Sequence, residues 1–222
     1  MTKLAEEQRN FSDLTILPHE EQGMNSGKTF NFFRFIAQSR GRNAPKQASF
    51  SLRPPRFVMK MDDDTFPVLP NPLQAFANLS CSQPAYIGTS WGCTQSFPFH
   101  FGGLGYALSW PLVVWLGNTS QPLPWWHTRG NEDARLGAYL LSLREPIVTV
   151  DYGVKMGSWY DDDTFPKDGG TIALHYLKEA KVYREQSERM WHIYSRGWRW
   201  EGARPWVERH KTMRAQWGAK GT

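Results

Sequence analysis

The segment Phe57–Phe66 constrains this chain most, because an apolar run of strand length ends abruptly in three consecutive carboxylates, Asp62 to Asp64. A single lysine, Lys60, interrupts the apolar run. Three carboxylates at one strand end repel one another unless a cation sits among them. Hard divalent ions such as Mg²⁺ or Mn²⁺ take oxygen ligands of this kind and keep positions open for phosphate oxygens. The segment therefore predicts a metal site at the edge of an α/β sheet, where open sheets bind ligands; the alternative is a solvated acidic turn.

The six letters that follow the apolar run occur twice, since Asp161–Pro166 repeats Asp62–Pro67 without a change. The letters DDDTFP therefore carry little information by themselves. The second copy follows Gly157–Tyr160 and precedes the polar run Lys167–Gly170, whereas the first copy follows an apolar strand. We predict that the first copy forms the site and that the second is a solvated loop.

The composition is typical of a globular chain with one sizeable domain: 222 residues, of which 40% are hydrophobic and 21% charged. A formal net charge of +5 and a pI of about 9.2 favour contact with polyanions or a nucleotide sugar. Lysine and arginine are spread along the chain, so no nucleic acid partner is expected. Aromatic residues, at 14%, suit a surface that stacks on sugars and a core equally well.

Two kinds of sequence signal bear on the compartment. Cys81 and Cys93 flank a loop-rich interval that could close as a disulfide, although two cysteines do not decide the compartment. Glycosylation sequons begin at Asn10, Asn78 and Asn118, which favours a secretory route. No signal peptide and no apolar run of membrane length is visible. The expectation is either a cytosolic protein or a chain from which the membrane anchor of a longer form is absent.

Residue patterns predict alternating helices and strands along the chain. The GKT triplet at 27–29 does not predict a phosphate-binding loop, because the preceding glycine, Gly23, is one position too close. Helices are predicted over 28–38, 71–79 and 131–141, strands over 11–17, 57–61, 86–89 and 171–178, a loop over 39–56, strand-like pieces over 147–160, and either a helix or a strand over 106–116. The basic, Trp-rich segment 179–222 is predicted as a helical extension of the domain formed by 1–178.

Three further features are compatible with a functional site but also have a structural explanation. Gly102 and Gly103 belong to a glycine-rich loop that permits close backbone approach. Glu132 and Asp133 follow the helix N-cap residue Asn131, where carboxylates stabilise a first helical turn. His175 stands in a short apolar strand, as a core residue or as a metal ligand.

In this order the motifs resemble those of the β-1,3-galactosyltransferase-like (fringe-like) family of inverting glycosyltransferases. Phe57–Phe66 is similar to the family's strand-plus-DDD motif, and Phe97–Ser109 to its YP-x-Y-x-SG-x-GY-x-x-S block. Glu132–Gly137 is similar to its EDV-x-x-G block. Phe11–Leu14 and Asn25–Thr29 resemble a degenerate form of its DIL…NLT-x-KT segment. The resemblance covers roughly residues 6 to 178, in motif order.

The resemblance implies a glycosyltransferase-A fold, a Rossmann-like mixed sheet flanked by helices, incomplete at its N-terminus. It implies a Mn²⁺-dependent hexosyltransferase that moves galactose or N-acetylglucosamine from a UDP-sugar to a hydroxyl of a glycan or glycoprotein, in the Golgi lumen or elsewhere in the secretory pathway. The alternative is a non-catalytic glycosyltransferase-like domain with a binding or assembly role. By position, Asp62, Asp64 and His175 would hold the metal, Asp63, Gly102 and Gly103 would lie at the donor, Asp133 would be the general base and Glu132 would orient the site.

Overall fold

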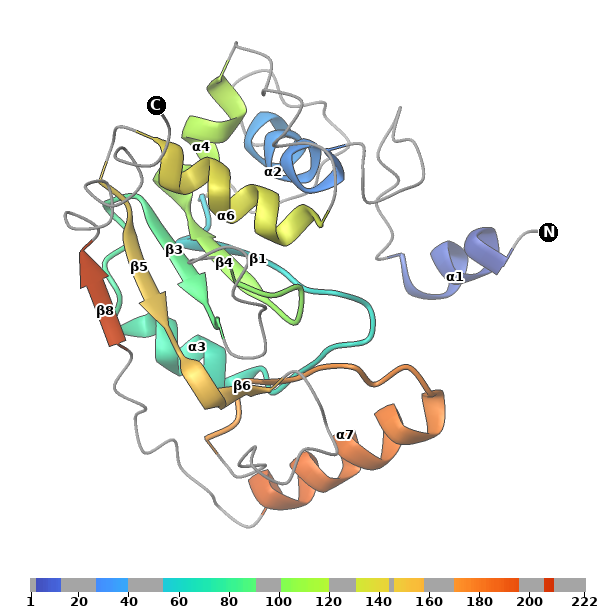
Figure 1. Ribbon diagram of the computed structural model, residues 1–222. Helices are drawn as coiled ribbons and strands as arrows, with labels where there is room; N and C mark the ends of the chain where they lie inside the picture. Colours follow the sequence, from blue (N-terminus) through green and yellow to red (C-terminus); the bar gives the residue numbers. More distant parts are fainter. Residues whose placement is uncertain are drawn as a thin grey trace.

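The computed structural model describes residues 3–12, 27–39, 54–90, 101–119, 131–143, 146–157, 170–195 and 206–209. Over these residues the chain is a mixed α/β protein with two mixed β-sheets and six α-helices (Figure 1). The α/β class expected from the sequence is therefore confirmed for the described part of the chain.

Five strands form the larger sheet, in the order β1-β4-β3-β5-β8. They are β1 (Phe57–Lys60), β4 (Tyr106–Ser109), β3 (Ala85–Gly88), β5 (Val148–Asp151) and β8 (Trp206–Arg209). β3 and β5 run parallel, and the other neighbouring strands are antiparallel. In the register of β1 and β4, Lys60 lies opposite Tyr106, so the last residue of β1 meets the first residue of β4.

A smaller sheet has the order β2-β7-β6, with β2 (Phe66–Pro67), β7 (Ala173–Leu174) and β6 (Met156–Gly157). β2 is antiparallel to β7, and β7 is parallel to β6. β1 leads to β2 through the turn with the three carboxylates, and β5 leads to β6 through the short 3-10 helix η1 (Gly153–Lys155). The carboxylate turn therefore joins the two sheets.

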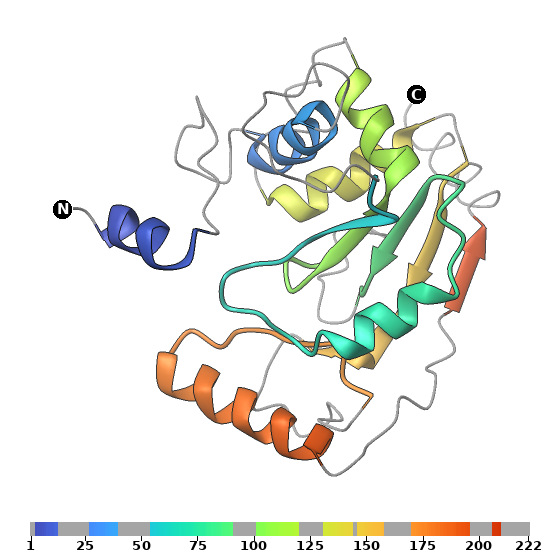
Figure 2. The same ribbon diagram turned by 180° about the vertical axis from the view of Figure 1, so that it is seen from behind.

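Side-chain alternation along the strands divides the core into two layers. Tyr86 of β3 and Tyr106 of β4 pack with the helices α2 (Lys28–Ser39), α4 (Trp110–Asn118) and α6 (Glu132–Ser142). The intervening Ile87 and Ala107 pack in a second cluster with α3 (Pro70–Ala77). Accordingly, α2, α4 and α6 lie together on one side of the larger sheet and α3 lies on the other (Figures 1 and 2).

The helix α7 (Ala180–Ser195) covers the smaller sheet, where Leu174, Leu177 and Met190 are buried together with Val68. Phe66 of β2 meets Tyr183 of α7 edge to face, with the ring centroids 5.6 Å apart. By contrast, α1 (Lys3–Phe11) has no buried residue and lies away from both sheets in the two views.

Most helices and strands lie where the residue patterns predict them. The ambiguous segment 106–116 contains both predicted structures, because β4 ends at Ser109 and α4 begins with Pro111 in its first turn. Three predictions are wrong. The strand predicted over 171–178 is reduced to β7 at Ala173–Leu174, so His175 follows a strand rather than standing in one. Phe11 ends a helix rather than starting a strand, and residues 206–209 form a strand rather than part of a helical extension, since they pair with the open edge of β5.

Several predictions fall on residues outside the described ranges: the second DDD copy at 161–163, Cys93 as a partner for Cys81, residues 13–17 of the first predicted strand and most of the basic loop 39–56. Among the helices that the structure describes, none combines the length and the apolar character that a bilayer-spanning helix needs.

We expect Gly88→Ala to destabilise the fold, because an added Cβ would lie 2.7 Å from the Cβ and Cγ of the buried Phe101 side chain. Overpacking of this kind costs about 1–3 kcal/mol of unfolding free energy, measurable by urea denaturation. Gly153→Asn is a comparison without overpacking, since nothing lies within 4 Å of its Cβ, and its destabilisation comes from the positive φ of 52° alone. A Gly88→Ala variant as stable as the wild type would contradict the packing described here.

Candidate functional site

The carboxylate turn is fixed by backbone hydrogen bonds on both sides. The Asp62 N–H donates to the Gly103 carbonyl at 3.0 Å, which continues the contact between β1 and the segment before β4. The Thr65 N–H donates back to the Asp62 carbonyl at 3.1 Å, and β2 then begins at Phe66. This turn leaves the three aspartates with different surroundings, because Asp63 is exposed while Asp62 and Asp64 are partly buried.

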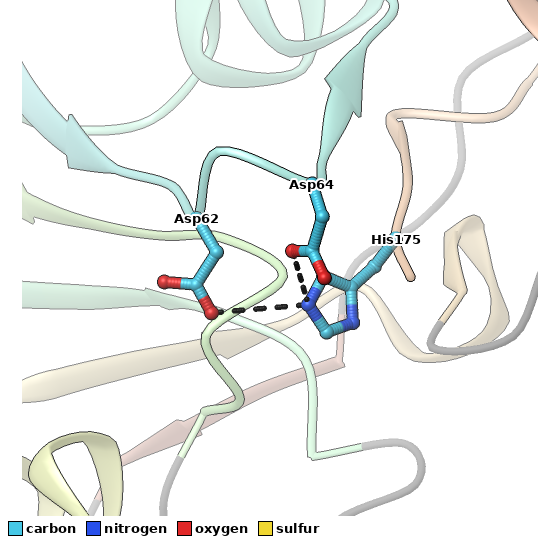
Figure 3. Close-up of side chains that lie close together, drawn as sticks. All are labelled: Asp62, Asp64 and His175. Atoms are coloured by element: carbon cyan, nitrogen blue, oxygen red, sulfur yellow. Dashed lines mark ion pairs between the residues drawn. The ribbon is translucent and has the colours of Figure 1, made fainter. Parts of the chain in front are cut away.

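Asp62 and Asp64 meet His175 at the junction of the two sheets (Figure 3). His175 Nε2 lies 3.1 Å from Asp64 Oδ1 and 3.8 Å from Asp62 Oδ2. One potential ligand atom from each residue falls within 4.8 Å of the other two. The structure therefore brings together the three residues that the sequence predicts as metal ligands.

The position of His175 follows from the end of β7. Its N–H donates to the Gly157 carbonyl at 3.0 Å, and the Leu177 N–H donates to the Asp64 carbonyl at 2.9 Å, so the chain after β7 folds over the carboxylate turn. Nδ1 of the imidazole is buried and makes no hydrogen bond to the described part of the chain. The imidazole is therefore held through Nε2, the atom that faces both aspartates.

The donor set fits a divalent ion of intermediate hardness. Two carboxylates supply hard oxygen ligands and the imidazole supplies one nitrogen, a combination that suits Mn²⁺ better than Ca²⁺. With three ligands from the protein, further coordination positions would remain for water or phosphate oxygens. These residues could thus hold a metal without rearrangement of the backbone.

A second pair of carboxylates enters the site from the first turn of α6. Asn131 caps this helix, and its side chain accepts a hydrogen bond from the Asp133 N–H at 3.2 Å. Glu132 Oε2 accepts a hydrogen bond of 2.7 Å from the Thr29 hydroxyl in the first turn of α2. The structural role predicted for these residues is confirmed, and both side chains also face the rest of the site.

Lys60 connects the two groups of carboxylates. Its ammonium pairs with Asp62 Oδ1, lies 3.1 Å from Glu132 Oε1 and lies 3.2 Å from Asp133 Oδ1. Strand alternation directs the lysine to the side of the sheet that α6 covers, as it does for Val58. Burial by itself would lower the pKa of Lys60, but the surrounding carboxylates outweigh burial and raise the pKa above its usual value.

The neighbouring carboxyls Glu132 and Asp133 ionise differently. Burial is the largest of the effects that raise the pKa of Asp133 to about 6. The negative charges of Asp62 and Glu132 also raise this pKa, whereas the positive charge of Lys60 lowers it. Burial would also raise the pKa of Glu132, but the hydrogen bond from Thr29 and the charge of Lys60 hold it below its usual value. Near neutral pH, Asp133 is consequently the carboxyl of this pair that is better able to accept a proton.

Gly103 lets the two carboxylate groups approach each other. A Cβ at this position would overlap the Asp62 carboxylate and would lie 2.7 Å from Asp133 Oδ2. Gly102 instead shapes the turn: its N–H donates to the Thr89 carbonyl at 3.2 Å, and its carbonyl accepts from the Gly105 N–H at 3.2 Å. Because Gly103 has no side chain, the carboxylates of Asp62 and Asp133 share the space beside its Cα.

Sequence reasoning missed three contributors to the site: Lys60, Thr29 and Lys178. Lys178 Nζ lies 3.4 Å from Asp64 Oδ2. The signal for Lys60 was present, because a single charged residue in an apolar strand needs a charged partner when it is buried. Asp63, predicted to lie at the donor, is exposed in the turn and forms no ion pair with the residues that the structure describes. No protein-family model and no curated protein matches this chain.

The raised pKa of Asp133 predicts a specific dependence of stability on pH. An unfolded aspartate ionises near pH 3.9, whereas Asp133 ionises near 6 in the folded chain. Its contribution to stability is therefore present below about pH 4 and is lost as the pH rises through 6. Without divalent ions, the unfolding free energy of the wild type relative to Asp133→Asn should fall by up to about 3 kcal/mol between pH 4 and 7.

Glu132→Gln provides the matched control for this measurement. Because the pKa of Glu132 is lowered, its contribution is present above the unfolded pKa and is lost as the pH falls. The wild type relative to Glu132→Gln should thus gain stability with rising pH. Urea denaturation at several pH values measures both differences, and slopes of equal sign would contradict the assigned environments.

Proposed function

We propose that this chain is a Mn²⁺-dependent inverting hexosyltransferase that transfers galactose or N-acetylglucosamine from a UDP-sugar to a hydroxyl group of a glycan or glycoprotein. The observation that carries the proposal is the convergence of Asp62, Asp64 and His175 on one point, with Asp133 beside Asp62 in the space that the missing side chain of Gly103 leaves open. These residues come from three separate parts of the chain. A solvated acidic turn would not require the histidine or the α6 carboxylates to meet it.

Asp62, Asp64 and His175 would hold the divalent ion, which when bound would neutralise negative charge on the diphosphate of the leaving nucleotide. The carboxylates of Asp62 and Asp64 would coordinate this ion. Lys60 pairs with Asp62 Oδ1 and so keeps Asp62 Oδ2 directed toward His175. His175 is held in place by its own backbone hydrogen bond to Gly157. The ligands are thus oriented before any ion arrives, which limits the reorganisation that binding requires.

Asp133 is our candidate for the general base. With a pKa raised by burial to about 6, it is ionised at neutral pH and yet basic enough to accept the proton of an acceptor hydroxyl. That oxygen would attack the anomeric carbon from the face opposite the leaving diphosphate. A single displacement inverts the configuration and needs no nucleophile from the enzyme. Glu132, ionised and held by Thr29, would orient Lys60 and thereby Asp133.

The glycosyltransferase-A fold and a location in the secretory pathway are part of the same proposal. The mixed sheet has helices on both faces, and the carboxylates follow the end of β1, which is consistent with that fold. The sequons at Asn10, Asn78 and Asn118 are consistent with a luminal compartment. The alternative, a non-catalytic glycosyltransferase-like domain, differs from the enzyme in one measurable respect: it would bind a UDP-sugar without transferring the sugar.

We expect Asp64→Ala to weaken Mn²⁺ binding by at least about tenfold, because it removes a ligand oxygen from the cluster. Asp63→Ala is the matched control: it removes an exposed carboxylate of the same turn and should leave the affinity within about twofold. Asp163→Ala, in the second DDD copy, should behave like Asp63→Ala. Isothermal titration with Mn²⁺ measures all four proteins, and loss of binding in Asp163→Ala instead of Asp64→Ala would reverse the assignment.

We expect Asp133→Asn to lower sugar transfer from a UDP-sugar by about a hundredfold or more, since general base catalysis contributes roughly 10²–10⁴-fold. Binding of Mn²⁺ and of UDP should change little, because Asp133 is not among the metal ligands. Transfer is measured with radiolabelled UDP-galactose and UDP-N-acetylglucosamine and a panel of glycan acceptors. Binding without turnover in the wild type would point to the non-catalytic alternative, and steeply salt-dependent nucleic acid binding would contradict both.

A further inference from the structure

Asp64 is shared between two basic side chains that have different exposure. Its Oδ1 faces His175 Nε2 at 3.1 Å, and its Oδ2 faces Lys178 Nζ at 3.4 Å. The side chain of Asp64 is only 16% exposed, whereas that of Lys178 is 60% exposed. The lysine therefore reaches the metal cluster from the solvent side.

The backbone after β7 places Lys178 in this position. Tyr176 has a φ of 68°, which is unusual for a residue with a side chain, and the Leu177 N–H binds the Asp64 carbonyl. This turn brings both His175 and Lys178 to the same carboxylate. The ammonium of Lys178 also lies 4.6 Å from the centroid of the Tyr176 ring, which supports the lysine on its path to Asp64.

The pair between Lys178 and Asp64 is weak and would compete with a metal ion. An ion pair of 3.4 Å that involves a largely exposed lysine contributes little to stability. A divalent ion on Asp64 would carry twice the charge of the ammonium and would repel it at this short distance. The flexible lysine side chain would then move to the nearest anion, and lysine is a common ligand for phosphate oxygens.

We propose that Lys178 is a phosphate-binding residue of the donor subsite. It pairs with Asp64 while no divalent ion is bound, and it contacts the diphosphate oxygens of the nucleotide sugar when both the ion and the nucleotide sugar are bound. This inference rests on the proposed function, since it takes the ion at Asp62, Asp64 and His175 as given. It assigns a role to Lys178, a residue outside the carboxylate motif Asp62–Pro67. Lys178 thereby makes metal binding less favourable in the absence of nucleotide and more favourable in its presence.

The test compares Lys178→Met with Lys181→Met in the full chain. Lys181 is also an exposed lysine, 84% exposed and paired with Glu185 on α7, so the control removes the same charge three residues away. Isothermal titration gives the affinity for Mn²⁺ alone and then the affinity for UDP and for inorganic pyrophosphate in saturating Mn²⁺. Pyrophosphate isolates the diphosphate contact from any contact with uridine.

We expect Lys178→Met to bind Mn²⁺ alone as tightly as the wild type or severalfold more tightly, and to bind both UDP and pyrophosphate about tenfold more weakly, as for one lost charge-assisted hydrogen bond. Lys178→Arg should retain most of the UDP affinity, and Lys181→Met should match the wild type. Parallel losses of Mn²⁺ and UDP affinity would indicate a structural role and overturn the inference. Unchanged UDP affinity would also overturn it while leaving the proposed function intact, whereas a wild type that binds no Mn²⁺ would overturn both.

Discussion

The ammonium of Lys60 among three carboxylates is the interaction on which the arrangement of the site depends. It joins the last residue of β1 to the turn that follows and to the first turn of α6. Glu132 extends the connection to α2 through the Thr29 hydroxyl. A buried ionic network of this kind often adds little net stability compared with apolar packing, because the charges must be desolvated. Its consequence here is geometric, since removal of the lysine would leave the buried Asp133 and the partly buried Asp62 and Glu132 facing one another.

The different pKa values of Glu132 and Asp133 show how one helical turn can give neighbouring carboxyls different chemistry. Glu132 is partly buried and Asp133 is buried, and both lie within 3.2 Å of the same ammonium. Only Glu132 also receives the Thr29 hydrogen bond, while Asp133 faces the additional negative charge of Asp62. Separation of the pKa values of paired acids by their surroundings is a recurrent way to assign proton-transfer roles.

Local sequence patterns were sufficient for much of the fold and for part of the site. The apolar run before Asp62 and the N-cap at Asn131 are local signals, and both elements are found as predicted. The partners of Lys60 were not predictable in this way, because they depend on which face of the sheet α6 covers. The pairing of β2 with β7 spans only two residues in each strand, and β8 forms on an edge left open by β5. Such contacts are specified by tertiary packing rather than by periodicity.

The junction of the two sheets has a consequence for the order in which the site would lose its structure. Asp62 follows a strand of the larger sheet, whereas His175 follows β7, a two-residue strand of the smaller sheet that depends on packing against α7. Both residues of β7 are buried, but in different clusters: Ala173 packs with the larger sheet and Leu174 packs against α7. Opening of the smaller sheet alone would withdraw His175 and Lys178 but leave Lys60, Glu132 and Asp133 in place on the larger sheet. The metal cluster therefore needs both sheets to be folded, whereas the contacts of Lys60 with Glu132 and Asp133 need only the larger sheet.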